Sequence, residues 1–476
     1  MTISTLRLLA VLLVASPAFA QETNDPLPAD IAATEDVVAV DFVEFATIPD
    51  IDGEPPRMML LLDEPGTSRL FVSDMTGLLY SVSYDGQSVE LYLDLRAATW
   101  GFPIESDGDE RGFQSFAFHP EFNTAGAPGF GKFYTYSDTP DTAPEPDFTP
   151  GGGDNTHDTV LLEWTASNPA AATYDGGPPR QLLRFEQPFR NHNAGHLGFN
   201  PLATPGSEDD GLLYVGVADG GSGADPLELG QNMSSAFAKI LRIDPLGTNS
   251  ANGQYGIPAS NPFVSDGNDG TLGEIYAVGL RNPQRLWWDP ANGNMYVAEI
   301  GQNIVEEISP VTAGANLGWN DWEGSFRFLS RQAVNVSDPR GDPQMTYPVV
   351  EYGQRDPLFS AACCAATGGF VYRDDAIPQL SNLFVFGDNP SGEVMYVDAD
   401  NLPDGGEDAI RRILFNDGGE AKTLIQIIRD RNATVGRPPA RRVDLRFGTG
   451  PDNQIFILNK QDGIVRLLVP AAAGSQ

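Results

Sequence analysis

The sequence has very few cysteines for its length. Only two of its 476 residues are cysteines, Cys363 and Cys364, and they are adjacent. Such a pair cannot provide the disulfide framework that stabilises many small exported domains. In an oxidising compartment the two residues close a vicinal disulfide, stay as two thiols, or pair with another chain, and the sequence leaves these alternatives open.

Basic residues are also scarce. The chain has 29 Lys and Arg against 65 Asp and Glu, which gives a formal net charge of −36. Because no basic stripe is present to neutralise phosphates, the composition argues against nucleic-acid binding. Attachment to an anionic membrane surface is disfavoured for the same reason.

Long hydrophobic runs are missing. The apolar run from Leu8 to Ala15 follows Arg7 and precedes Ala18-Phe19-Ala20, which is the pattern of a secretory signal peptide. The run is too short to span a bilayer, so we expect no membrane insertion. We therefore predict a signal peptide over residues 1–20, cleaved after Ala20, and a periplasmic or secreted protein.

Several signatures of common enzyme classes are absent. The sequence contains no Gly-x-Ser-x-Gly elbow, no Gly-x-Gly-x-x-Gly after a strand and no phosphate-binding loop. This excludes serine hydrolases, nicotinamide dehydrogenases and nucleotide hydrolases that carry their usual motifs. A propeller hydrolase or lactonase would need several inward carboxylates at a central metal site, and no such set is apparent.

What the sequence does contain is a repeated strand. The chain has 51 Gly and 38 Pro and almost no sustained helical periodicity, which favours an all-β protein with many turns. Short apolar cores recur roughly 60 to 90 residues apart, at 70–74, 132–136, 213–217, 295–299, 383–387 and 454–458.

Six such cores without linkers predict a six-bladed β-propeller rather than a tandem of β-sandwiches. We expect an N-terminal extension over residues 21–39 and the propeller over residues 40–470, with 464–468 supplying a closing strand.

Two loops carry the candidate chemistry. His192 lies in a Gly-rich loop, where a general base with a near-neutral pKa can approach a substrate closely. A metal pair of His192 and His196 is the alternative, although no third His or Cys lies nearby. In the second loop region, Arg281 and Asn282 precede Glu306 and Glu307, a combination that suits an anionic, metal-chelated ligand or a solvated surface corner.

A series of motifs resembles the glucose/sorbosone dehydrogenase family over roughly residues 40 to 470. They occur in the family's order at 111–113, 117–120, 191–195, 213–221, 239–245, 279–283, 301–303, 306–308, 316–319, 367–372 and 386–388. As a set these motifs are specific, although each is weak alone. The resemblance implies a periplasmic six-bladed propeller that oxidises aldose sugars with pyrroloquinoline quinone (PQQ) and Ca²⁺.

The resemblance also implies roles for individual residues. His192 matches the catalytic base. Arg281, Asn282 and Arg441 match cofactor-binding positions, and Cys363 lies in a cofactor-contacting segment. Gly301 and Gln302 match the loop whose carbonyls hold the PQQ-linked Ca²⁺, and Glu306 and Glu307 match acidic positions tied to structural Ca²⁺.

The sequence departs from the family at three cofactor positions. Glu110 stands where the family has Gln, Asn389 lies near a family Lys, and Val443 replaces a second C-terminal Arg, for which Arg442 or Arg446 is available. Two hypotheses follow. One is a PQQ- and Ca²⁺-dependent dehydrogenase with a small sugar or alcohol substrate and an external electron acceptor. The other is a Ca²⁺-stabilised propeller that has lost PQQ and binds a carbohydrate or a protein.

Overall fold

The computed structural model describes residues 21–471, except residues 65, 107, 109, 143, 194 and 360–363. The predicted signal peptide and Cys363 lie outside the described residues. Within this part the protein is nearly all-β, as expected. Its one α-helix is α1 (Leu424–Thr434), and three 3₁₀ turns are η1 (Ala98–Trp100), η2 (Pro378–Leu380) and η3 (Pro451–Asn453).

Most strands form four-stranded antiparallel units, each named here for its first strand. The β3 unit contains β3 (Met58–Glu64), β4 (Arg69–Asp74), β5 (Leu78–Ser83) and β6 (Val89–Asp94). The β7 unit contains β7 (Phe113–Phe118), β8 (Lys132–Thr139), β9 (His157–Thr165) and β10 (Arg180–Gln187). The β11 unit contains β11 (Leu197–Phe199), β12 (Leu213–Val217), β13 (Lys239–Ile243) and β14 (Ile275–Val278).

The later part of the chain repeats this pattern. The β15 unit contains β15 (Pro283–Trp288), β16 (Met295–Glu299), β17 (Val305–Val311) and β21 (Val350–Gly353). The β22 unit contains β22 (Ala366–Tyr372), β23 (Leu383–Asp388), β24 (Val394–Asp398) and β25 (Arg411–Asp417), extended by β26 (Glu420–Lys422). The β27 unit contains β27 (Arg446–Thr449), β28 (Ile455–Leu458), β29 (Ile464–Val469) and β2 (Val38–Thr47).

The β27 unit is assembled from both ends of the described chain. Its outer strand β2 pairs antiparallel with β29 and parallel with β25. The expected closing segment at 464–468 therefore lies in β29, and the strand that covers its edge comes from the N-terminal side. A separate small sheet contains β1 (Glu22–Thr23), β20 (Ala333–Asn335), β19 (Phe326–Ser330) and β18 (Trp322–Glu323).

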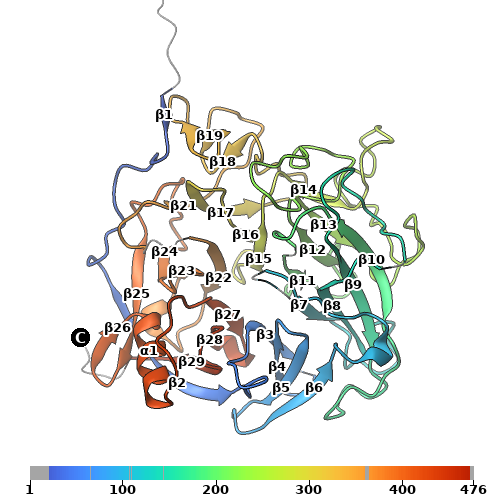
Figure 1. Cartoon of the computed structure of the whole chain (residues 1–476), viewed down its shortest axis with the longest axis horizontal. Coiled ribbons are helices and arrows are strands. Elements are labelled where there is room, and N and C mark those ends of the chain that lie inside the picture. Colours follow the sequence, from blue (N-terminus) through green and yellow to red (C-terminus); the bar gives the residue numbers. More distant parts are fainter. Residues whose placement is uncertain are drawn as a thin grey trace, which may run out of the picture.

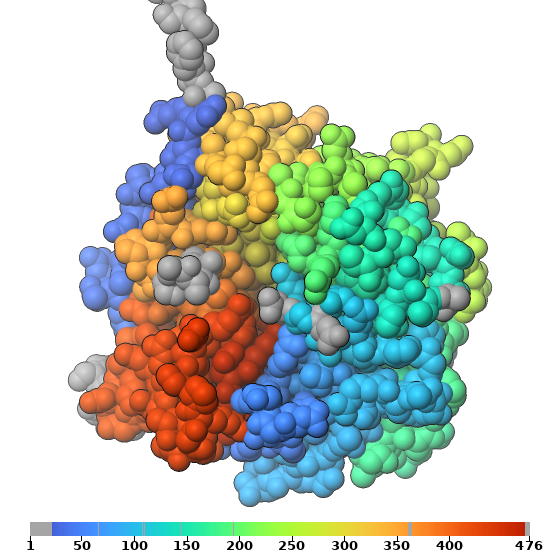
Figure 2. Space-filling model, in the orientation of Figure 1, coloured from blue at the N-terminus to red at the C-terminus, as the bar shows by residue number. Residues whose placement is uncertain are grey.

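The units follow one another around a centre. First strands of successive units contact each other in the order β3, β7, β11, β15, β22 and β27, and β27 returns to β3 through a parallel pair. Figure 1 shows these first strands facing the middle of the molecule. The space-filling view shows the sequence colours succeeding one another around the same face (Figure 2).

The repeated strand predicted from the sequence has one structural place. The apolar cores fall on β4, β8, β12, β16, β23 and β28, the second strand of each unit. On β12, Leu213, Val215 and Val217 pack towards the β7 unit, whereas Tyr214 packs towards the β15 unit. Because alternate side chains of a strand point to opposite faces, a strand covered on both faces has to be apolar throughout.

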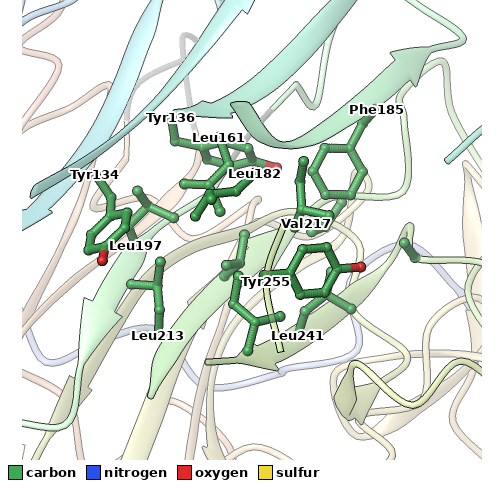
Figure 3. Packing of buried hydrophobic residues seen from close by; sticks show 14 of the residues in the cluster. Tyr134, Tyr136, Leu161, Leu182, Phe185, Leu197, Leu213, Val217, Leu241 and Tyr255 are labelled. Carbon is green, nitrogen blue, oxygen red and sulfur yellow. The ribbon is translucent and has the colours of Figure 1, made fainter. Parts of the chain in front are cut away.

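The core is divided among the contacts between neighbouring units. In the cluster of Figure 3, Tyr136 and Phe185 of the β7 unit meet Leu213 and Val217 of the β11 unit. The other large clusters likewise combine residues of two neighbouring units, including the β27 and β3 units, where Phe456 packs with Val72. Each unit is therefore held by burial of apolar surface on both of its faces.

Candidate active site

The predicted site residues come from two kinds of loop. Glu110, His192, Arg281 with Asn282, and Arg441 lie in segments that lead into the first strands β7, β11, β15 and β27. Gly301 with Gln302, and Asn389, lie between the second and third strands of their units. In an antiparallel up-and-down unit these two kinds of loop lie at the same end, so the fold brings the predicted residues to one face.

His192 forms a dyad with Asp219. The side chain of His192 is buried, and its Nδ1 lies 2.6 Å from Asp219 Oδ1. Burial by itself raises the pKa of Asp219, but the neighbouring His192 and Arg281 outweigh it and leave the pKa below its usual value. An ionised Asp219 fixes the proton on Nδ1 and leaves Nε2 as the acceptor. Among the described residues nothing hydrogen-bonds to Nε2.

Asp219 is itself held on several sides. Its Oδ2 accepts a hydrogen bond from Trp319 Nε1 at 3.0 Å, and its Oδ1 accepts one from the Gly221 N–H at 2.9 Å. The sequence analysis placed Asp219 and Trp319 within family motifs but gave neither a role. The available signal was an acid in a Gly-rich loop, and only the tertiary structure shows which histidine it contacts.

Glu110 contacts the backbone of the histidine loop. Its Oε2 accepts a hydrogen bond from the His192 N–H at 2.7 Å. His192 has a φ of +58°, in the left-handed region that non-glycine residues seldom occupy. The exposed Glu110 carboxylate thus stabilises the loop conformation that presents the imidazole.

Arg281 connects the histidine dyad to the Gly301 loop. Its Nη1 donates to the carbonyl oxygens of Ile300 at 2.8 Å and Gly301 at 2.7 Å. Its guanidinium also lies 5.8 Å from the ring centre of Trp319. Arg281 Nε and Asn282 Oδ1 are buried and have no hydrogen-bond partner among the described residues. These two atoms remain available to a ligand.

The predicted metal residues are buried and already hydrogen-bonded. Glu306 accepts hydrogen bonds from Gln354, Ala366 and Gly301, and burial raises its pKa to about 8. Burial likewise raises the pKa of Glu307, which accepts from Ser309 and Gly324, to about 8. Across the described part of the chain, no group of three or more His, Cys, Asp or Glu side chains is arranged to hold a metal ion.

Gly301 and Gln302 form a tight turn. A side chain at Gly301 would collide with the Val305 carbonyl oxygen, which would lie 1.6 Å from its Cβ. Gln302 accepts from the Ala224 N–H at 2.5 Å, and its own N–H donates to Glu323 at 2.9 Å. The glycine is therefore required by the turn itself, whatever its carbonyl binds.

The three departures from the family occupy one corner of the site. Asn389 donates through Nδ2 to the Leu445 carbonyl at 3.2 Å, and Val443 is buried. Arg441 is exposed and has no hydrogen bond or ion pair in the described structure. Two basic residues, Arg446 and Lys460, lie beside this corner, and the sequence analysis left the first undecided and missed the second. Cys364 is half-buried and disulfide-bonded.

A cavity of about 600 Å³ lies along the first strands of all the units. It is lined mainly by residues towards the C-terminal ends of these strands, among them Leu62, Phe118 and Trp288. The candidate site residues precede the N-terminal ends of the same strands. The cavity therefore opens away from the histidine dyad, along the centre of the ring. His196 borders this cavity, and burial holds its pKa well below the usual value.

None of the described helices is long and apolar enough to cross a membrane.

Similarity searches bring related proteins into view. The chain is 29% identical over 356 residues to the HIPL1 protein of Arabidopsis thaliana, covering 68% of this chain and 49% of that protein. It is 28% identical over 329 residues to the human Hedgehog-interacting protein, covering 68% of this chain and 39% of that one. The chain thus spans about half the length, or less, of these curated relatives.

Solved structures share the fold. The apo-form of the soluble aldose sugar dehydrogenase from Escherichia coli matches 90% of this chain and 97% of its own, with a TM-score of 0.58 and 16% identity. The PQQ-bound aldose sugar dehydrogenase from Streptomyces coelicolor matches 96% of this chain and 99% of its own, with a TM-score of 0.53 and 15% identity. The family model described as Glucose / Sorbosone dehydrogenase matches residues 56–416. The chain therefore belongs to the glucose/sorbosone dehydrogenase family.

Proposed function

We propose that the protein is a six-bladed propeller that oxidises an aldose sugar or related alcohol with PQQ and Ca²⁺. The observation that carries the reaction is the His192–Asp219 dyad, at 2.6 Å, on the face where the loops of several units meet. The ring of contacts between first strands supports the propeller architecture.

The described residues fit a small polycarboxylate. Arg281 Nε, Arg446 Nε and Asn282 Oδ1 are buried polar atoms without hydrogen-bond partners in the described structure. Buried polar groups are normally satisfied, so such atoms at one face indicate a missing ligand. Arg281, Asn282 and Arg446 would hold the carboxylates and the neighbouring oxygens.

A Ca²⁺ ion would be held by backbone carbonyl oxygens. Gly301 and Gln302 would supply them, because the described side chains form no acidic cluster for a metal. The Gly301 carbonyl accepts one hydrogen bond from Arg281 and keeps a second lone pair. Hard oxygen ligands of this kind suit Ca²⁺.

The protein's own contribution to the reaction is proton removal and positioning. Asp219 keeps the Nδ1 proton of His192 in place, so that Nε2 takes the proton from the substrate hydroxyl. Glu110 and the left-handed backbone at His192 hold the imidazole in this orientation. PQQ, when bound, supplies a quinone that accepts the hydride, and an external acceptor would then receive the electrons.

The test is a titration of the purified protein with PQQ in millimolar Ca²⁺, followed by absorbance and then by a panel of aldoses. Saturable binding and sugar-dependent reduction of the quinone are the expected results. The proposal is wrong if micromolar PQQ does not bind, or if bound PQQ is not reduced by any sugar or alcohol in the panel.

A second candidate is a propeller that binds a carbohydrate or a protein without catalysis. Two observations favour it: Arg441 points into solvent instead of into the site, and relatives of similar identity include a protein named for its interaction with Hedgehog. This candidate predicts no PQQ binding, and the same titration therefore separates the two.

A further inference from the structure

Three cationic side chains lie near the centre of the ring without a carboxylate partner. Arg285 belongs to β15, Arg446 begins β27, and Lys460 lies between β28 and β29. In the described part of the chain, none of the three forms an ion pair or a hydrogen bond with a carboxylate. This is unexpected in a protein with 65 acidic residues.

Lys460 has the weakest set of contacts. Its Nζ donates only to the Met75 sulfur, at 3.2 Å, in the described structure. Burial, together with repulsion from Arg446, lowers its pKa to about 7. Arg57 and Arg442 add to the positive charge around it, and Asp444 is the acid that faces it. The side chain is half-buried, so its ammonium is within reach of a ligand.

The nearest acid is occupied elsewhere. Asp444 accepts hydrogen bonds from Arg442 Nη2 at 2.6 Å and from Gln461 Nε2 at 2.9 Å. It therefore forms no contact with Arg446 or Lys460. Arg446 is 5% exposed, donates through Nη1 to the carbonyl of its own neighbour Leu445 at 2.8 Å, and leaves Nε without a partner.

Arg285 extends the positive charge across the ring. Its Nη2 donates to the Met59 carbonyl oxygen of β3, the first strand three units away along the ring, and its Nη1 donates to the Gln284 carbonyl. Burial, with Arg446 nearby, lowers its pKa to about 9. Arg285 therefore spans the centre and places a cation beneath Arg446.

Arg446 and Lys460 lie next to the positions where the family's cations are missing. The Leu445 N–H donates to the Asn389 carbonyl at 2.9 Å, and Asn389 Nδ2 returns a bond to the Leu445 carbonyl at 3.2 Å. The Lys460 N–H donates to the Val443 carbonyl at 3.3 Å. The segments that carry the two departures are thus joined directly to the segments that carry the two unpaired cations.

We propose that Arg446 and Lys460 bind the carboxylates of a small polycarboxylate ligand and replace the cations lost at Asn389 and Val443. A guanidinium can hold one carboxylate in a two-pronged contact, and a half-buried ammonium can hold a second as a point charge. Unpaired cations near the centre are costly in the free protein and favourable once an anion neutralises them. Arg441, in solvent, takes no part. This inference rests on the proposed function where the ligand is PQQ, and it names the residues that make PQQ binding compatible with this sequence.

The test measures binding of two polycarboxylates by calorimetry and thermal melting. PQQ is titrated in millimolar Ca²⁺, and citrate, a tricarboxylate without a quinone, is titrated without Ca²⁺. The variants are Lys460→Gln and Arg446→Gln, with Arg442→Gln as the matched control, because Arg442 is an adjacent exposed arginine already paired with Asp444. We expect each of the first two to weaken binding by about 10- to 100-fold. The control should change binding by less than about twofold.

Folding is checked in the same melts. Lys460→Gln removes an unpaired charge, so the ligand-free variant should melt at or above the temperature of the wild type while binding more weakly. A residue with a merely structural role would show the opposite sign. Arg446→Lys restores a charge without the flat guanidinium, and should recover part of the affinity lost in Arg446→Gln.

The outcomes separate this inference from the proposed function. PQQ binding that is unchanged in Lys460→Gln and Arg446→Gln would overturn the inference and leave the proposed function standing. Citrate binding lost in both variants, with no PQQ binding by the wild type, would support the anion site and refute the PQQ-dependent function. Failure of the wild type to bind either compound would refute both.

Discussion

The candidate site has two halves that differ in how their polar groups are satisfied. In the half built by the β7, β11 and β15 units, His192, Asp219 and Arg281 all have close partners and match the family's motifs. In the half built by the β22 and β27 units, Asn389 and Val443 depart from the family, and Arg446 and Lys460 lack carboxylate partners. The first half is organised by the protein alone, whereas the second requires a ligand to neutralise it.

Two lysines make the same contrast within one chain. Burial lowers the pKa of both Lys239 and Lys460 to about 7. Lys239 is fully buried, and its ammonium donates to the carbonyls of Leu229, Gly230 and Phe237 at 2.8–3.1 Å. Lys460 has only a sulfur. A lowered pKa therefore does not distinguish a structural lysine from a binding one, but the hydrogen-bond partners do.

The largest effect should come from the partnered half. His192→Ala removes the proposed base and should lower kcat by about 10²- to 10⁴-fold, because general-base catalysis contributes on that scale. The affinity for PQQ should stay within a few-fold, as measured by calorimetry. Loss of PQQ binding together with turnover would show that the two halves are not separable.

Asp219→Asn tests the partner of the base. An asparagine keeps the shape of the side chain but no longer fixes the Nδ1 proton, so kcat should fall by about 10²-fold. The pH dependence of kcat should shift towards lower pH, because the imidazolium loses its neighbouring anion. An unchanged pH profile would contradict a dyad.

The lysine contrast can be measured directly as stability. Lys239→Gln should lower the free energy of unfolding by about 2–3 kcal/mol, because three buried carbonyls lose a charged donor. Lys460→Gln should leave it within about 0.5 kcal/mol of the wild type or raise it. Denaturant unfolding of the two ligand-free variants gives both values, and equal destabilisation would remove the distinction drawn here.

Restoring the family's residue at the entrance should produce a smaller effect. Glu110→Gln keeps an acceptor for the His192 N–H and removes an exposed negative charge near the proposed polycarboxylate site. The Kd for PQQ should fall by about 2- to 5-fold, on the scale of an exposed charge interaction. Weaker binding in this variant would indicate that the carboxylate holds the loop in a way that an amide cannot.

The smallest expected effect is on pH dependence. Lys460 is protonated up to about pH 7 in the folded state and up to its higher normal pKa when unfolded. Between these values the unfolded state binds more protons, so this group makes the ligand-free protein more stable as pH rises. The stability difference between wild type and Lys460→Gln should rise by less than about 1 kcal/mol from pH 7 to pH 10. Saturating polycarboxylate should remove this dependence.

The sequence predicted the fold better than the site. The second strand of each unit could be recognised because it packs on both faces and is therefore a short, wholly apolar run. The role of β2 could not, since its pairing with β29 joins residues at opposite ends of the chain. Ile464 was correctly placed in the last unit, but the strand beyond it was not identified.

The limits at the site have a similar physical cause. The motif around His192 is local, and so its loop could be identified from neighbouring residues. Its contact with Asp219 joins two loops of one face, and no local spacing encodes it. Arg441 and Arg446 differ by five positions on a segment whose direction is set by tertiary contacts, and the sequence could not determine which of them faces inward. Lys460 carried no motif at all.

The position of β2 has a consequence for how the chain becomes a folded protein. Its partner β29 is more than 400 residues away, so the β27 unit cannot be completed until nearly all of the chain has been made. The other units have their four strands in sequence order and can pair as they emerge. The first long strand to appear therefore waits for the last one, and closing the ring becomes a late event. Because β27 and β28 of that same unit flank Arg446 and precede Lys460, the cationic half of the site forms only when the two ends of the chain have met.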